Sequence, residues 1–139
     1  MKIEELRIGN YVKHHDPICG TNIYAVLDII GRDNRIFLDS DTIGTASCGI
    51  EHIQPIELTE EVLGKIVGVK IVDLDYNKTG LIGTNYHFND CMVSLIYKRD
   101  KCHTQLISSR YNISLDIKYI HELQNAYYCL TGKELEFEL

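Results

Sequence analysis

The sequence predicts an α+β fold that is rich in β structure. Apolar and polar residues alternate in many short segments, which is the pattern of strands with one buried face. Residues 119–131 instead repeat their apolar side chains at helical spacing, and segments with the strand period lie before and after them. Turn-forming residues separate the short segments. We therefore expect antiparallel sheets and a helix that packs on one of them.

Residues 1–57 predict a compact β unit. A strand begins at Tyr11 and ends in a polar stretch, residues 23–30 form a stronger strand, and a tight turn at 33–34 leads into a third strand at 36–38. Short strands at this close spacing are typical of a small SH3-like β-barrel, which is the fold that we expect for this unit.

Residues 58–139 predict a second, α+β unit, so the chain is either one domain or a small barrel joined to this unit. A short connector helix opens it, with Thr59 as the N-cap and Glu60 and Glu61 in the first turn, where the helix dipole favours negative charge. Gly68 ends this helix. The alternating segments that follow predict an antiparallel sheet.

The helix predicted at residues 119–131 is amphipathic. Gly132 follows it, where a left-handed cap is expected, and the alternation after that glycine predicts a final strand. The apolar stripe, which we assign to the core, consists of Ile120, Leu123, Tyr127 and Leu130. The polar face, which we assign to solvent or to a partner subunit, consists of His121, Glu122, Gln124 and Asn125.

The composition argues against several classes of protein. The 139 residues carry a net charge of −6, which disfavours a protein that coats nucleic acid through its overall field. No apolar run approaches the roughly twenty residues that span a bilayer, and the first residues lack the apolar core of a signal peptide. We expect a soluble, cytoplasmic protein that does not enter the membrane.

The cysteines and histidines do not form a recognisable site. The five cysteines are widely scattered without a CxxC pair, so we expect neither disulfides nor a zinc site, and we expect Cys91 and Cys129 to be buried as small apolar residues. Residues 14–16, two histidines and an aspartate, predict an exposed polar loop. Cys102 and His103 could form a catalytic pair only if the thiol faced the imidazole, and neighbouring residues on an extended chain rarely face each other. We predict no catalytic residue, metal or cofactor.

One cluster of cationic and aromatic residues suits phosphate and base recognition. It consists of Tyr97, Lys98, Arg99, Lys101, His103, Arg110 and Tyr111. We predict these seven residues as a ligand-binding site. The alternative is a hairpin tip whose solvated charges protect a sheet edge.

Four blocks of the sequence, in order along nearly the whole chain, carry a resemblance to a known family. They are LRIGNYV at 6–12, IQPIELTEE at 53–61, IKYIHELQN at 117–125 and LTGKEL at 130–135. Their pattern resembles a family of small proteins of gut Bacteroidales and their phages or prophages, mostly described as hypothetical. The chain departs from that pattern after Glu61, where a tryptophan-containing helix is expected, and at 126–129, where bulkier apolar residues are usual.

The resemblance implies a β-rich first unit, a connector helix and an α+β second unit, without a catalytic motif. With the basic and aromatic cluster, it suggests a non-catalytic binding protein of phage or mobile-element origin. Such a protein would sequester a nucleotide-like small anion, for example a host immune signal, and could do so as a homo-oligomer. The alternative is an adaptor that holds another protein through the SH3-like unit or a sheet edge. A hydrolase that uses Cys102 or a pair of histidines has the least support.

Overall fold

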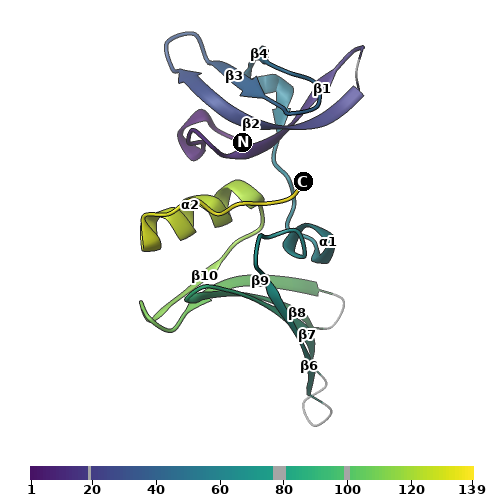
Figure 1. Cartoon of the computed structure of the whole chain (residues 1–139), viewed down its shortest axis with the longest axis vertical. Helices are drawn as coiled ribbons and strands as arrows, with labels where there is room; N and C mark the ends of the chain where they lie inside the picture. The colour runs from purple at the N-terminus through teal and green to yellow at the C-terminus, as the bar shows by residue number, and fades with distance from the viewer. Residues whose placement is uncertain (19, 77–80, 99–100) are drawn as a thin grey trace. The chain divides into compact units, whose positions relative to one another are not determined.

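The computed structural model describes residues 1–18, 20–76, 81–98 and 101–139 (Figure 1). In these ranges the chain forms two antiparallel five-stranded sheets and two α-helices, which confirms the prediction of a β-rich fold with a helix near the carboxyl end. The chain divides into two compact units. Unit 1 contains Met1–Glu57 and Tyr119–Ala126, and unit 2 contains Leu58–Lys118 and Tyr127–Leu139. Unit 1 thus joins the first 57 residues to the segment 119–126, which lies far from them in the sequence.

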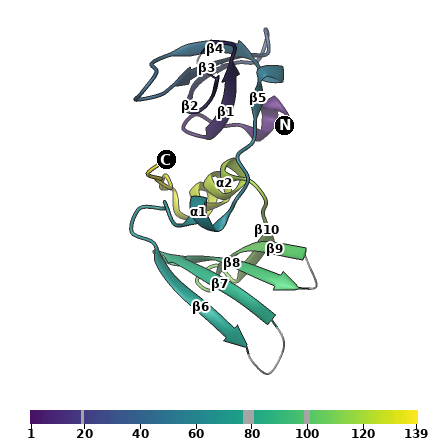
Figure 2. The same cartoon turned by 90° about the vertical axis from the view of Figure 1, so that its right-hand side faces the viewer.

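The sheet of unit 1 is a meander that returns to its first strand (Figure 2). Its strand order is β4-β3-β2-β1-β5, and a 3-10 helix at Ile50–His52 precedes the last strand. The strands are β1 (Tyr11–Asp16), β2 (Gly20–Ile30), β3 (Arg35–Asp39), β4 (Ala46–Gly49) and β5 (Ile53–Gln54). The turn between β2 and β3 contains Asn34 at a φ of 50°, a conformation that asparagine adopts more readily than most residues.

The polar residues 14–16 lie in β1 and not in a loop, so this expectation was wrong. His14 pairs with Asn22 and Asp16 with Gly20, because β2 continues far enough to give them backbone partners. The imidazole of His14 is buried and meets the ring of Tyr24 edge-on at 5.7 Å. Together with the buried side chains of neighbouring strands it faces the core of unit 1. That core consists of Leu6, Val12, Tyr24, Val26, Ile36, Leu38, Cys48 and Ile53.

Unit 2 opens with the short helix α1 (Glu60–Leu63), which ends at Gly64 and not, as we predicted, at Gly68. The hydroxyl oxygen of Thr59 accepts a hydrogen bond from the backbone N–H of Val62 at 3.3 Å, which confirms the predicted N-cap. A five-stranded meander with the order β10-β9-β8-β7-β6 follows (Figure 2). Its strands are β6 (Lys70–Tyr76), β7 (Leu81–Phe88), β8 (Cys91–Lys98), β9 (Lys101–Ser108) and β10 (Ile113–Asp116).

The two faces of this sheet differ in burial. Tyr86, Val93 and Leu106 are paired across β7, β8 and β9, and all three are buried. Since side chains alternate along a strand, the next residues point to the opposite face. We call this opposite face, which includes His87 and Met92, the outer face of unit 2; these two side chains are only half-buried.

Helix α2 (Ile120–Thr131) has the predicted boundaries to within one residue, and Gly132 ends it at a φ of +70°. Half of its polar face is not solvated as we expected: His121 is 2% and Gln124 1% exposed, whereas Glu122 and Asn125 are half-buried. Gln124 can be buried because its amide bonds to backbone groups of unit 1, whereas the His121 ring stacks on Tyr119 with centroids 5.7 Å apart.

The final strand that we predicted does not form among the described residues. Phe137 makes one isolated bridge with Ile66, flanked by hydrogen bonds from Val67 N to Glu136 O and from Glu138 N to Lys65 O. The alternation in this segment reflects the burial of Leu135 and Phe137 and not membership of a sheet.

Cys91 is buried as predicted, but Cys129 is exposed and that prediction was wrong. Cys129 lies on α2 beside exposed Tyr128, outside the apolar stripe that the helix buries. Within the described part of the chain, no helix has both the length and the apolar character that crossing a membrane requires.

Candidate functional site

Those residues of the predicted site that the structure describes lie toward the two ends of β9. Lys98 pairs with Lys101 at the β8–β9 hairpin, whereas Arg110 and Tyr111 follow the opposite end of β9. An eight-residue strand such as β9 is roughly 23 Å long between its end residues, so one small ligand cannot contact both groups. The side chains of Tyr97, Lys98 and Lys101 and the whole of Arg99 lie outside the described residues; His103 is exposed.

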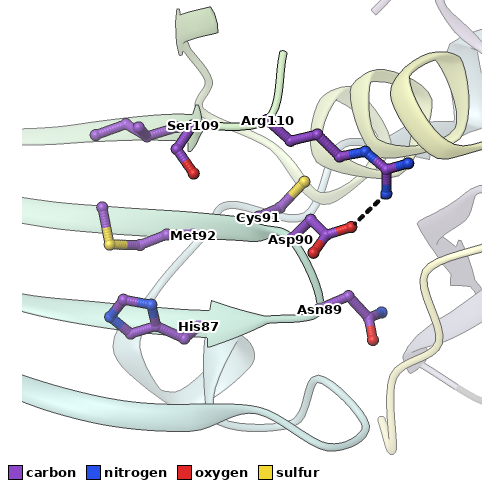
Figure 3. Close-up of a pocket in the computed structure, with 8 residues that line it drawn as sticks. His87, Asn89, Asp90, Cys91, Met92, Ser109 and Arg110 are labelled. Carbon is purple, nitrogen blue, oxygen red and sulfur yellow. Dashed lines mark hydrogen bonds and ion pairs between the residues drawn. The ribbon is translucent and has the colours of Figure 1, made fainter. Parts of the chain in front are cut away.

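A depression of about 330 Å³ lies beside Arg110, at the end of the sheet where two turns meet (Figure 3). One is the two-residue turn between β7 and β8, and the other is the four-residue turn between β9 and β10. The lining consists of His87, Asn89, Asp90, Cys91, Met92, Ile107, Ser109 and Arg110. All these residues belong to unit 2, so the site is complete within one unit.

Asp90 connects the two turns. Its carboxylate accepts a hydrogen bond from Nη1 of Arg110 at 2.7 Å, and Figure 3 shows the arginine side chain reaching that carboxylate from the neighbouring turn. The backbone oxygen of Asp90 accepts a second bond from the Ser108 hydroxyl at 3.1 Å. The Asp90 carboxylate therefore orients the guanidinium of Arg110, although the side chains of both residues are exposed.

Arg110 is the cation of the depression. Its hydrogen bond to Asp90 raises the pKa of the guanidinium above its ordinary value, and its Cζ lies 5.5 Å from the centroid of the Tyr111 ring. Among the described residues Arg110 donates to Asp90 alone. Because a guanidinium has five N–H donors, several remain for a ligand.

Asn89 holds the β7–β8 turn against α2. It adopts a φ of 51°, and its side-chain amide donates a hydrogen bond to the hydroxyl of Tyr127 at 2.6 Å. The Tyr127 ring also packs on Phe88, with centroids 5.7 Å apart. Two contacts to one buried tyrosine thus position the turn that carries Asp90.

A row of half-buried side chains extends the depression onto the outer face of unit 2. His87 pairs with Met92, and Met92 pairs with Ile107 across β7, β8 and β9. Directly paired residues point to the same face of a sheet, with Cβ atoms about 5 Å apart. The depression therefore combines one cation at its rim with an imidazole and an apolar surface.

Neither nucleophilic nor metal chemistry is indicated in the described residues. Burial raises the pKa of the Cys91 thiol, so the reactive thiolate is disfavoured at neutral pH. No group of three or more His, Cys, Asp or Glu residues in the described ranges could hold a metal ion. The side chain of Cys102 lies outside those residues.

Sequence reasoning found Arg110 but missed Asp90 and the row through Met92. The dipeptide Asn89-Asp90 between two alternating segments is a turn signal, and it could have placed Asp90 in a hairpin turn. The pairing of His87, Met92 and Ile107 depends on strand register, which the residue pattern alone did not give.

The two units carry very different charge. Unit 1 contains five Lys or Arg and ten Asp or Glu residues, a net charge of −5, whereas unit 2 contains nine and ten, a net charge of −1. The overall charge of −6 therefore arises almost entirely in unit 1, and the unit that contains Arg110 is nearly neutral.

Comparisons with known protein families, with curated proteins and with solved structures find no match to this chain. The resemblance to proteins of Bacteroidales and their phages thus stays a prediction from the sequence.

Proposed function

We propose that this chain is a non-catalytic binding protein of phage or mobile-element origin that sequesters a small, nucleotide-like anion in the depression beside Arg110. The observation that carries the proposal is a guanidinium that is oriented by Asp90 and retains unused donors at the rim of a depression. Guanidinium groups bind phosphate and carboxylate groups with paired hydrogen bonds.

The remaining lining suits the uncharged part of such a ligand. The volume of about 330 Å³ falls at the lower end of the range of small-molecule pockets. Met92 and Ile107 supply apolar surface, and His87 and Ser109 supply polar atoms. A base or another flat ring would contact the row on the sheet while its phosphate meets Arg110.

The proposal can be tested by isothermal titration calorimetry with a panel of mono-, cyclic and oligonucleotides and inorganic phosphate. We expect at least one nucleotide to bind, and Arg110→Ala to weaken its binding roughly tenfold or more, because a charge-assisted bond is lost. Asp90→Asn should strengthen binding, since the carboxylate competes with the ligand for the guanidinium. Arg32→Ala, at an exposed turn of unit 1, is the matched control and should leave the affinity unchanged.

Two results would overturn this proposal. One is the absence of binding heat with every member of the panel. The other is binding that survives Arg110→Ala but is lost in a Lys98→Ala/Lys101→Ala double variant, which would place the anion at the other end of β9.

We also propose that unit 1 is an SH3-like barrel. The strand order supports it, because the chain returns after the four-strand meander β1–β4 and pairs β5 with β1, a non-sequential pairing that suits a small barrel. The 3-10 helix before β5 reverses the chain over that short distance. An experimental structure of the chain would test the assignment; an open sheet with β5 unpaired would contradict it.

A further inference from the structure

Unit 1 exposes large apolar side chains on the outer face of its sheet. Leu27 is 45%, Ile30 36% and Phe37 38% exposed, although each lies in one of the two strands β2 and β3. Apolar groups at such positions are usually covered. At these exposed fractions the described residues leave more than a third of each side chain open to solvent.

These three side chains lie next to one another. Phe37 pairs with Asp28, and Ile30 pairs with Arg35. Because these two pairs are two residues apart along each strand, all four side chains point to the same face of the sheet. The register shifts between Val26 and Asp28, so Leu27 is the extra residue of a β-bulge. We call Leu27, Ile30 and Phe37 the Phe37 patch.

The residues between them point the other way. Ile29 and Ile36 pair with each other and belong to the core side of the sheet, where Ile36 is fully buried. The patch is therefore a surface feature and not a loosely packed part of the core. Substitution of one of its side chains can remove the patch without removing core packing.

Acidic groups lie beside the patch. Asp28 is exposed opposite Phe37, and Asp39 lies on the same face two residues after Phe37, paired with Ala25. The nearby Arg35 donates a hydrogen bond to the Ser47 hydroxyl at 3.1 Å. These carboxylates add to the net charge of −5 of unit 1.

We propose that the Phe37 patch docks a segment of a partner protein that carries apolar side chains flanked by lysine or arginine. The apolar residues of the segment would cover the patch, and its cations would meet Asp28 and Asp39. Charge complementarity selects this occupant over a second copy of the chain, because two copies would bring two strongly acidic units together. This function goes beyond ligand binding at Arg110, which lies in unit 2.

The test uses three synthetic peptides of equal length on the full chain: alternating Lys and Leu, alternating Glu and Leu, and alternating Lys and Ser. Backbone amide shifts, followed by NMR during titration, should change in β2 and β3 with the Lys-Leu peptide alone, and the affinity should fall as salt is added. Phe37→Ser should weaken binding at least tenfold. Asp28→Asn/Asp39→Asn should weaken it severalfold and remove most of the salt dependence.

The matched control is Ile71→Ser, which removes another exposed apolar strand residue, 54% exposed in unit 2, and should leave binding unchanged. The amide spectrum of each variant shows directly whether the fold is kept. Equal binding of the Glu-Leu or the Lys-Ser peptide, or shifts confined to other strands, would overturn the proposal. So would a concentration-dependent dimer that Phe37→Ser abolishes, since the occupant would then be a second copy.

Discussion

The side-chain amide of Gln124 hydrogen-bonds to the backbone on both sides of Asn10, and the Gln124 oxygen accepts from the backbone N–H of Tyr11 at 2.9 Å. Its nitrogen donates to the backbone oxygen of Gly9 at 3.0 Å. The neighbouring Asn125 accepts from the Asn10 side chain at 2.9 Å. Since Gln124 is 1% exposed, these bonds are made away from water and fix α2 to the chain just before β1.

Gln124→Met keeps the size of this side chain but removes its bonds to Gly9 and Tyr11. We expect a loss of roughly 2 to 6 kcal/mol in the free energy of unfolding, because two backbone groups lose their partner and each such buried group costs about 1 to 3 kcal/mol. Urea denaturation measures it. The same substitution at exposed Gln54 is the control and should change stability by less than about 0.5 kcal/mol. Equal effects at the two positions would show that the buried bonds are not stabilising.

The sequence predicted the elements better than their environment. Periodicity located α2 and the strands because it reports which residues share a face. It could not show that half of the polar face of α2 is buried, because the partners of Gln124 are backbone groups more than a hundred residues away, and any residue offers such groups.

The candidate site was predicted in part for a related reason. The predicted cluster contains residues from both ends of β9. Because a strand rises about 3.3 Å per residue, residues that are close in sequence can lie far apart in space. Arg110 acquires its partner Asp90 only through the pairing of β8 with β9, which is a long-range property of the sheet.

The imidazole of His121 predicts a loss of stability in acid. Burial lowers its pKa below the ordinary value of about 6.5, although the carboxylates of Glu122 and Glu5 act in the opposite direction and the chain's amino group adds to the lowering. Because the pKa is lower in the folded state, the unfolded state takes up the proton first. Stability is therefore full above the unfolded pKa and falls as the pH drops below about 6.5.

Urea midpoints between pH 7.5 and 5.5 measure this effect. The uptake of one proton on unfolding changes the free energy of unfolding by at most about 1.4 kcal/mol per pH unit. His121→Leu should flatten the profile, whereas His52→Ala, at an exposed histidine, should leave its shape unchanged. Identical profiles for the wild type and His121→Leu would contradict the assignment.

Thr59→Ala should destabilise the protein by about 1 kcal/mol, because the N–H of Val62 loses its side-chain partner at the start of α1. Thr59→Ser retains a hydroxyl oxygen and should recover most of the loss. Thermal unfolding of the three proteins measures the difference. If serine and alanine were equally destabilising, the effect would come from the threonine methyl group and not from the cap.

Gly83 in β7 is needed for the close approach of two strands. A Cβ built at this position would lie 2.7 Å from the backbone oxygen of Leu95, and a backbone atom inside a paired sheet cannot move aside as the end of a side chain can. Gly83→Ala should therefore cost about 1 to 3 kcal/mol, the usual penalty for overpacking. Gly31→Ala is the matched control, because nothing lies within 4 Å of its added Cβ, and its stability should stay within about 0.5 kcal/mol of the wild type.

Urea midpoints of the two variants measure both effects, and amide hydrogen exchange in β7 and β8 should accelerate in Gly83→Ala alone. Unchanged exchange in these strands would show that β7 and β8 pair less closely at this position.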